Sequence, residues 1–238
     1  MKPTSEQYYD DFSANYERHR HHGYHRLLDD LEVDLALRHS SGLVLEAGCG
    51  TGLILERIAR DRPGSQGFDL SLGMLRGAQR RRLVVSQASV TDLPFPNEAF
   101  DTVVSFKVLA HIPNIERAVS EFARVTRPGG TLILEFYNRW SLRYLQKRLK
   151  PASPIGTAFT DEDVFTRFDS LDTVRSYLTP DLAIEAIHGV RVLTPFAQAH
   201  NLPILAPLLS RLEWAARDLP ILRHLGGFLV VVARKTDR

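Results

Sequence analysis

Short apolar runs alternate with helical patterns over the first 137 residues of the chain. Residues 5–38 contain little glycine or proline and predict two helices, the second over about 24–37. Five short apolar runs then predict strands, and helical stretches separate several of them. Strands that alternate with helices indicate a parallel sheet covered on both faces. The predicted strands are 43–45, 67–70, 83–85, 100–105 and 131–136, and the predicted helices are 53–59, one capped by Ser71, and 115–125.

From residue 139 onward the rhythm changes. Residues 139–180 predict a mixture of helix and loop, and 182–193 predict a long strand with a turn near Gly189. A helix over 203–216 and a final strand over 227–233 follow. Because no internal repeat or low-complexity segment occurs, we expect a single domain over residues 1–238.

Composition places the chain among ordinary globular proteins. Of its 238 residues, 44% are hydrophobic and 24% are charged, which excludes disordered, collagen-like and disulfide-rich classes. A formal net charge of +2 argues against a protein that coats nucleic acid. The single cysteine, Cys49, cannot form an internal disulfide, and the amino terminus lacks the apolar stretch of a signal peptide. No apolar run approaches the roughly 20 residues of a membrane-spanning helix, so we expect a cytoplasmic protein.

A glycine-rich turn after the first predicted strand carries the first chemical signal. Its sequence is Glu-Ala-Gly-Cys-Gly-Thr-Gly over residues 46–52, followed by Leu53. A phosphate-binding P-loop needs Lys at position 53, and a dinucleotide fingerprint needs a small residue there, so neither motif fits. A third pattern, acidic-x-Gly-x-Gly-x-Gly, is matched at every position by Glu46, Gly48, Gly50 and Gly52. A plain tight turn is the alternative interpretation of this segment.

Further signals follow in a regular order. Asp69 ends the second predicted strand, where a carboxylate can accept two hydrogen bonds from ribose hydroxyls; the alternative is a helix-capping Asp. Residues 88–95 with 100–104, residues 109–114, and residues 127–130, which contain a predicted turn at 128–130, complete five motifs. With this order and spacing, residues 40–137 resemble the class I S-adenosylmethionine-dependent methyltransferases, near the small-molecule and quinone methyltransferases. Residues 8–20 also resemble the amino-terminal segment of that family, in positions 8–12 and 14–16.

The resemblance implies an α/β fold and a cofactor, S-adenosyl-L-methionine. The fold would be a Rossmann-like sheet of seven strands in the order 3-2-1-4-5-7-6, with the last strand antiparallel and helices on both faces. Glu46 would help to hold the methionine ammonium group, and Gly48 and Gly50 would let the backbone approach the cofactor. Asp69 would bind the ribose, and Leu70 would pack on the adenine.

The resemblance assigns four further residues to the cofactor. Val90 would offer its backbone N–H to the adenine, Phe106 would line the methionine side, and Tyr16 would close over the cofactor. Ser89 departs from the family, which usually has an acidic residue at this position to accept from the adenine amino group. A serine accepts that hydrogen bond without a charge, so weaker cofactor binding, or a water at this position, is expected.

His111 is the candidate catalytic residue, because it follows the fourth predicted strand near the methyl end of the cofactor. A base is needed only where the acceptor must lose a proton, and the alternative is a histidine that fixes a loop. Residues 105–108 lack the Pro-Pro-Tyr signature of enzymes that methylate the amino groups of bases. Cys49 lies in the glycine turn, which excludes a cysteine nucleophile for cytosine C5, and no acidic cluster predicts a metal site.

Two segments are expected to bound the acceptor pocket. The first is a lid over residues 1–26, whose histidines favour a polar, flexible segment over a metal site. The second is a cap over 139–180, which begins with a basic amphipathic helix; its basic side chains would form a solvated face or contact an anionic substrate or a lipid surface. The histidines are His19, His21, His22 and His25, and the basic residues are Arg139, Arg143, Lys147 and Lys150.

These observations predict methyl transfer to a small, partly apolar acceptor by in-line displacement. Phe106, His111, Tyr137 and Asn138 are expected to line the acceptor pocket with Arg139 and Arg143, because ligands bind at the carboxyl ends of parallel strands. Two alternatives stay open: a methyltransferase that acts on a peptide or another macromolecule, and a non-catalytic cofactor-binding partner subunit. The pattern leaves the acceptor atom and the oligomeric state open, and it allows peripheral contact with lipid.

Overall fold

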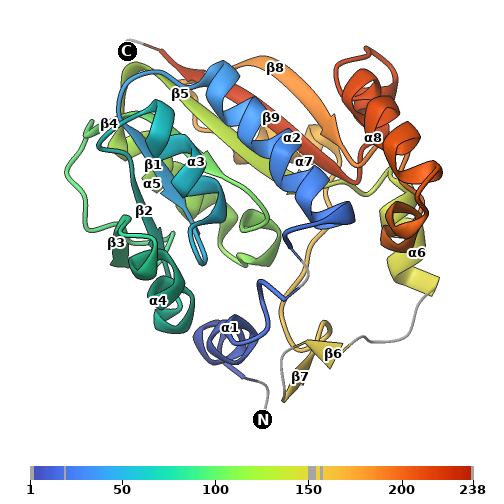
Figure 1. Cartoon of the computed structure of the whole chain (residues 1–238). Helices are drawn as coiled ribbons and strands as arrows, with labels where there is room; N and C mark the ends of the chain where they lie inside the picture. Colours follow the sequence, from blue (N-terminus) through green and yellow to red (C-terminus); the bar gives the residue numbers. More distant parts are fainter. Residues whose placement is uncertain (1–2, 19, 150–153, 156–157, 237–238) are drawn as a thin grey trace.

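Seven strands form one mixed sheet in the computed structural model, which describes residues 3–18, 20–149, 154–155 and 158–236 (Figure 1). The order along the sheet is β3-β2-β1-β4-β5-β9-β8, and β9 runs antiparallel to both of its neighbours. Numbered within this sheet alone, the order is 3-2-1-4-5-7-6, which confirms the predicted topology. The strands are β1 (Val44–Ala47), β2 (Gln66–Asp69), β3 (Val84–Gln87), β4 (Phe100–Ser105), β5 (Thr126–Tyr137), β8 (Leu182–Val190) and β9 (Phe228–Lys235).

Helices cover both faces of the sheet. One buried apolar cluster joins the sheet to α2 and α3, and a second joins its other face to α5 and α7. Both faces are therefore removed from water, as a largely parallel sheet requires. The helices are α1 (Ser5–Ser13), α2 (Gly23–His39), α3 (Leu53–Asp61), α4 (Leu72–Arg80), α5 (Ile115–Val125), α6 (Leu142–Leu149), α7 (Leu171–Tyr177) and α8 (Leu205–Ala216), with short 3₁₀ turns η1 (Leu109–His111), η2 (Ala197–Asn201) and η3 (Leu222–Leu225).

Two predicted turns are wrong. The segment 128–130 lies inside β5, where the pairing with β4 shifts register between Phe100 and Thr102 and absorbs the glycines as an irregularity. Gly189 lies inside β8 and pairs with Leu229, and a side chain there would clash with the backbone of Arg223 at 2.5 Å. The glycine therefore serves a close backbone approach rather than a turn.

Residues 139–180 hold more structure than the sequence predicts. Besides α6 and α7, they contain a small antiparallel pair of strands, β6 (Pro154–Ile155) and β7 (Phe159–Thr160). Residues 150–153 and 156–157 of the predicted cap lie outside the described residues. Within the described ranges, no helix combines the length and the apolar character needed to cross a bilayer. The carboxyl ends of β1, β2 and β4 meet at one edge, below which α1 lies (Figure 1).

Candidate functional site

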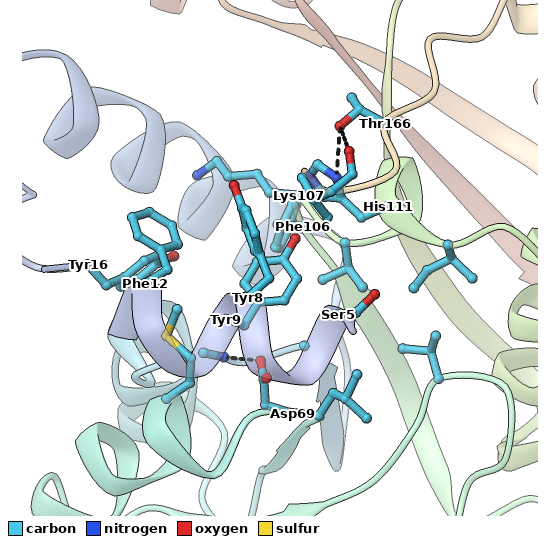
Figure 2. A pocket seen from close by; sticks show the side chains of 18 of the residues that line it. Ser5, Tyr8, Tyr9, Phe12, Tyr16, Asp69, Phe106, Lys107, His111 and Thr166 are labelled. Carbon is cyan, nitrogen blue, oxygen red and sulfur yellow. Dashed lines mark hydrogen bonds between the residues drawn. The ribbon is translucent and has the colours of Figure 1, made fainter. Parts of the chain in front are cut away.

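A cavity of about 420 Å³ opens at this edge of the sheet. Its lining comes from the glycine turn, the ends of β2 and β4, the amino-terminal helix α1, residues 164–168 and α6. Figure 2 shows α1 passing over one side of the cavity, with Tyr8, Tyr9 and Phe12 directed from it toward the sheet. Nine of the ten residues predicted for the site line this cavity: Tyr16, Gly48, Gly50, Asp69, Leu70, Ser89, Val90, Phe106 and His111.

The glycine turn uses its glycines for two different reasons. Gly48, Gly50 and Gly52 all have positive φ angles, of 74°, 54° and 84°. A Cβ on Gly48 would lie 2.2 Å from Val108 Cγ2, and one on Gly52 would lie 2.4 Å from Leu83 Cδ1. At Gly50 a Cβ would meet only the Tyr16 ring, at 3.9 Å, so the conformation alone requires glycine there.

Asp69 is held between two backbone turns. Its Oδ2 accepts a hydrogen bond from the Gly50 N–H at 2.9 Å, and its Oδ1 accepts one from the Ser71 N–H at 2.9 Å. Burial raises the pKa of this carboxyl group, while the same backbone donors oppose the rise. The cap of α4 is Ser71, which accepts from the Met74 N–H, so Asp69 is free of the capping role considered as its alternative.

Glu46 lies beside a second, smaller cavity of about 30 Å³, which shares Tyr16, Gly48 and Lys107 with the main one. The side chain is buried, and its Oε2 has no hydrogen-bond partner. Burial, together with the nearby carboxyl groups of Glu32 and Asp69, raises the pKa of Glu46 well above its usual range. A cationic group placed here would supply the missing partner and favour the ionised carboxylate.

Ser89 and Tyr16 both line the cavity. The Ser89 hydroxyl is already bonded within its own turn, 2.8 Å from Thr91 Oγ1, and it accepts from the Thr91 N–H at 3.3 Å. Tyr16 packs over the glycine turn, and the Arg20 guanidinium lies 4.5 Å from the centre of its ring. Burial raises the pKa of Tyr16, so its hydroxyl is neutral and can donate a hydrogen bond.

His111 has a defined tautomer. Its Nδ1 lies 2.9 Å from the Phe165 carbonyl oxygen, which only accepts, so Nδ1 carries the proton. Nε2 is then an acceptor, and the Tyr137 hydroxyl donates to it across 3.3 Å. Burial lowers the pKa of His111 to about 4. At neutral pH the ring is therefore uncharged, and its Nε2 lone pair accepts the hydrogen bond from Tyr137.

Aromatic rings and one arginine shape the wall beside His111. The Arg143 guanidinium lies 4.1 Å from the ring centre of Tyr137, 4.7 Å from that of Phe228 and 5.3 Å from that of Phe168. Arg143 Nη1 is buried and has no hydrogen-bond partner. Stacking on rings leaves the guanidinium donors of Arg143 available to an anionic group in the cavity.

Two residues predicted for this wall do not line the cavity. Asn138 is buried, and its Nδ2 donates to the carbonyls of His224 at 2.8 Å and Gly226 at 2.9 Å. The amide therefore joins β5 to the start of β9 instead of meeting a ligand. Arg139 is exposed and lies beside the Trp140 ring, while Lys147 joins Arg143 in the lining; Lys150 lies outside the described residues.

The sequence analysis missed a buried charge cluster behind Phe106. Lys107 Nζ lies 2.7 Å from the Glu32 carboxylate and 3.4 Å from Asp29, and the Lys107 N–H donates to Glu135 Oε1 at 3.1 Å. Glu32 and Glu135 are fully buried. The signal was a charged residue inside each of three apolar segments: Glu32 in a Leu-rich helix, and Lys107 and Glu135 at the ends of apolar strands.

The amino-terminal segment is attached to α4 and its two ends by side-chain contacts. Asp10 Oδ1 accepts from the Ser71 hydroxyl and from the Gly73 N–H, and Glu17 pairs with Arg81 at 2.9 Å. His21 also lies 3.8 Å from Glu17, and His19 falls outside the described residues. Over the part of the chain that the structure describes, no group of three or more His, Cys, Asp and Glu side chains is placed to hold a metal ion.

Comparisons with known proteins identify the fold and the domain. Residues 45–134 match the family model described as a methyltransferase domain. A demethylmenaquinone methyltransferase of Thermobifida fusca is 29% identical over 152 residues, which are 61% of this chain and 63% of that protein. A Thermotoga maritima protein described as an S-adenosylmethionine-dependent methyltransferase superposes with a TM-score of 0.65 at 19% identity, over 97% of this chain and 99% of its own.

The same fold also carries another activity. The cyclase SpnF superposes with a TM-score of 0.65 at 22% identity, over 100% of this chain and 98% of its own, so the fold does not by itself decide the reaction. The chain spans 63% of the length of the Thermobifida relative. The sequence matches agree with the resemblance inferred from the five motifs. That resemblance implies S-adenosylmethionine as the cofactor, which is also the cofactor named for the Thermotoga protein. Residues 45–134 match the methyltransferase domain model, and the described chain has the class I methyltransferase fold.

Proposed function

We propose that this protein transfers a methyl group from S-adenosylmethionine to a small, partly apolar acceptor. The observation that carries the proposal is the continuity of the cavity, in which the glycine turn and Asp69 form one end and His111, Tyr137 and Arg143 form the other. The name of the Thermobifida relative, a demethylmenaquinone methyltransferase, supports an acceptor of quinone-like character.

The residues at the first end fit the cofactor. The unpartnered Glu46 Oε2 suits the ammonium group of the methionine moiety. Gly48 keeps the backbone of the turn free of a side chain, since a Cβ there would lie 2.2 Å from Val108 Cγ2. Asp69 presents a carboxylate, preorganised by two backbone donors, for the ribose hydroxyls. Leu70 and Val90 supply apolar contact for the adenine, beside the Ser89 turn.

The bound cofactor supplies an electrophilic methyl group, and the protein positions the acceptor and excludes water. Tyr16 and the α1 side chains would cover the cavity, and Phe106 would pack at its centre. We assign residues 1–26 as a lid and 139–180 as a cap on this basis. Hydrogen exchange at the amides of residues 5–18 should slow when S-adenosylhomocysteine binds, and full protection in the free protein would contradict the lid.

His111 is proposed as the group that takes up the acceptor proton. A ring with a pKa near 4 removes a proton poorly from a free hydroxyl. The ring can instead accept the proton late in the reaction, when the bond between the acceptor oxygen and the methyl carbon has largely formed. This new bond makes the hydroxyl strongly acidic, and the proton then moves from the oxygen to Nε2. His111→Gln should lower kcat by about 10²-fold without changing cofactor affinity. An unchanged kcat would assign His111 to loop fixation or indicate an acceptor that needs no base.

Calorimetry and turnover test the proposal together. S-adenosylmethionine and S-adenosylhomocysteine should bind, whereas NAD should not, because residue 53 is leucine. Release of S-adenosylhomocysteine should then depend on a small acceptor such as a hydroxylated quinone or phenol. Cofactor binding without turnover on any small acceptor would favour the two alternatives, a peptide or other macromolecular substrate and a non-catalytic partner subunit.

A further inference from the structure

Exposed large apolar side chains are concentrated at one end of the molecule. The described residues include seventeen of them, and fifteen lie between Trp140 and Leu225. The other two, Leu72 and Val84, are isolated on α4 and β3. Apolar exposure gathered in one part of a surface marks a site of interaction, whereas scattered exposure does not.

Helix α8 turns its apolar face outward. Its buried positions are Leu209, Glu213 and Ala216, and the Glu213 carboxylate accepts from the Val192 and Leu193 N–H groups at 2.7 and 2.9 Å. Because these positions share one side of the helix, the opposite side faces solvent. Outside this buried strip, the exposed apolar residues are Leu208, Leu212 and Trp214 on the helix and Ile204 directly before it, which is 88% exposed. A helix whose glutamate is buried while its leucines face water lacks a partner for its apolar side.

Helix α6 extends the same surface. Leu142, Leu145 and Leu149 are exposed on it, next to the exposed Trp140. The side chain of Gln146 links α6 to the loop before η2, since it donates to the Pro195 carbonyl and accepts from Arg191 at 3.1 Å. The turn η2 in turn contacts α8. Figure 1 shows α6, in yellow, beside the orange-red helical segments at the right-hand edge.

The charges on this surface have one sign. Helix α6 has no acidic residue; its Arg148 is exposed, whereas Arg143 and Lys147 face the cavity and Lys147 pairs with Asp161. On α8, Arg211 is exposed. Between residues 193 and 216, all of which the structure describes, Arg211 is the one exposed charged residue. Asp218, just beyond α8, is engaged by Arg38 and His188. The surface therefore combines leucine, isoleucine and tryptophan with basic residues.

We propose that this α6–α8 face, formed by Trp140, the exposed residues of α6 and the outer side of α8, docks on an anionic lipid bilayer. Amphipathic helices that lie in the headgroup region place Leu and Trp in the acyl boundary and Arg and Lys at the anionic headgroups. A second copy of the chain suits the face less well. A two-fold contact would bring the exposed cations Arg148 and Arg211 of both copies together in a desolvated interface, and neither α6 nor α8 has an exposed carboxylate to pair them.

The position of α6 connects this face to the cavity. Arg143 and Lys147 line the cavity from the inner side of α6, while Leu142, Leu145 and Leu149 are exposed on its outer side. On the proposed methyl transfer, a lipophilic acceptor dissolved in the bilayer would reach the cavity past this helix. The docking itself does not depend on the methyl transfer, and its test uses no activity.

The two tryptophans make the test direct. The chain has two in all, and both Trp140 and Trp214 lie on the α6–α8 face. Vesicles of phosphatidylcholine and phosphatidylglycerol in equal parts should shift the tryptophan emission to shorter wavelength and sediment the full chain. Vesicles of phosphatidylcholine alone should bind it about tenfold more weakly, and high salt should weaken binding to the anionic vesicles. Unchanged emission and no sedimentation with either vesicle would overturn the proposal.

Paired variants distinguish binding through the α6–α8 face from nonspecific hydrophobic binding to vesicles. Ile204→Ser with Leu208→Gln should lower the fraction bound to anionic vesicles by about tenfold, because two exposed apolar side chains are lost. Leu72→Gln with Val84→Ser removes the same kind of side chain elsewhere and should bind like the parent. Equal loss in both pairs would contradict the proposal. So would an emission shift that depends on protein concentration without vesicles and accompanies a dimer in sedimentation velocity, since a second copy would then cover the face.

Discussion

The two ends of the cavity are built in different ways. The cofactor end comes mainly from one stretch, residues 46–90, and consists largely of backbone at positive φ and the Asp69 carboxylate, which two backbone N–H groups hold in place. The acceptor end is assembled from α1, residues 106–112, Tyr137, α6 and residues 164–168. It consists mainly of aromatic rings, a neutral histidine and the three cations Lys107, Arg143 and Lys147.

This difference indicates which end tolerates change. A glycine at positive φ has no side chain that can rearrange. A side chain added there therefore blocks the ligand or breaks the turn. Side chains from separate segments can repack around ligands of different shape. We expect substitutions at the cofactor end to act nearly all-or-none, and substitutions at the acceptor end to act in graded steps.

The largest effect is expected for Gly48→Val. The new Cβ would lie 2.2 Å from Val108 Cγ2, and φ is +74° at this position, so the turn cannot keep its shape. Titration calorimetry should detect no binding of S-adenosylhomocysteine, while the circular dichroism spectrum still shows a folded protein. Binding within tenfold of the parent would mean that the glycine turn is no cofactor cradle.

The next effect is expected for Asp69→Ala. Loss of hydrogen bonds to a charged carboxylate, each worth about 1.5–3 kcal/mol, should weaken cofactor binding by roughly 10²–10⁴-fold. Part of this loss would come from the Gly50 and Ser71 N–H groups, which Asp69 now holds. The control is Asp172→Ala, since the Asp172 side chain is 88% exposed and pairs with Arg175. Equal affinities in the two variants would remove the ribose assignment.

A smaller, selective effect is expected for Arg143→Ala. The KM for an acceptor with an anionic or strongly polarised oxygen should rise about tenfold, because an unpartnered guanidinium donor is lost from the cavity wall. Cofactor affinity should stay unchanged. Arg139→Ala is the matched control, since Arg139 lies on the same segment outside the cavity. A parallel loss of cofactor affinity in the Arg143 variant would show that the two ends are not separable in this way.

The smallest effect is expected from pH. Because the pKa of His111 is lowered to about 4, the ring stays neutral down to about pH 5, and kcat should change less than about twofold between pH 7.5 and 5.5. An ordinary histidine would titrate in that range. Stability should behave differently. Between pH 6.5 and 4 the unfolded chain binds a proton at His111 that the folded chain does not, so stability falls as pH falls.

Chemical denaturation at several pH values tests whether stability falls as the pH falls. The free energy of unfolding of the parent should decrease more between pH 6.5 and 4.5 than that of His111→Gln, which cannot titrate. A kcat profile that falls with an apparent pKa of 6–7 and disappears in His111→Gln would show instead that His111 titrates normally. The acceptor end would then be open to water during turnover.

The sequence alone determined the sheet and the cofactor end of the cavity. Alternation of apolar runs and helices is local, so the strands 100–105 and the helix 115–125 could be predicted to the residue, and the strand order came from the family resemblance. Gly48, Gly50 and Asp69 belong to one turn and the strand beside it, where spacing in the chain is close to spacing in the structure. The residues at this end could therefore be predicted from the sequence.

Only the tertiary structure decided the acceptor end and the outer surface. Asn138 stands directly after a strand, as a pocket residue should, but its amide holds backbone carbonyls 86 and 88 residues away. Lys107, Glu32 and Asp29 form one cluster although 75 or more residues separate the lysine from the acids. In the same way, the leucines of α8 fit a buried helix by pattern, yet Glu213 takes the inner side because backbone donors of a distant loop need its carboxylate. Contacts between distant segments depend on how the helices pack, and that arrangement has no local signal in the chain.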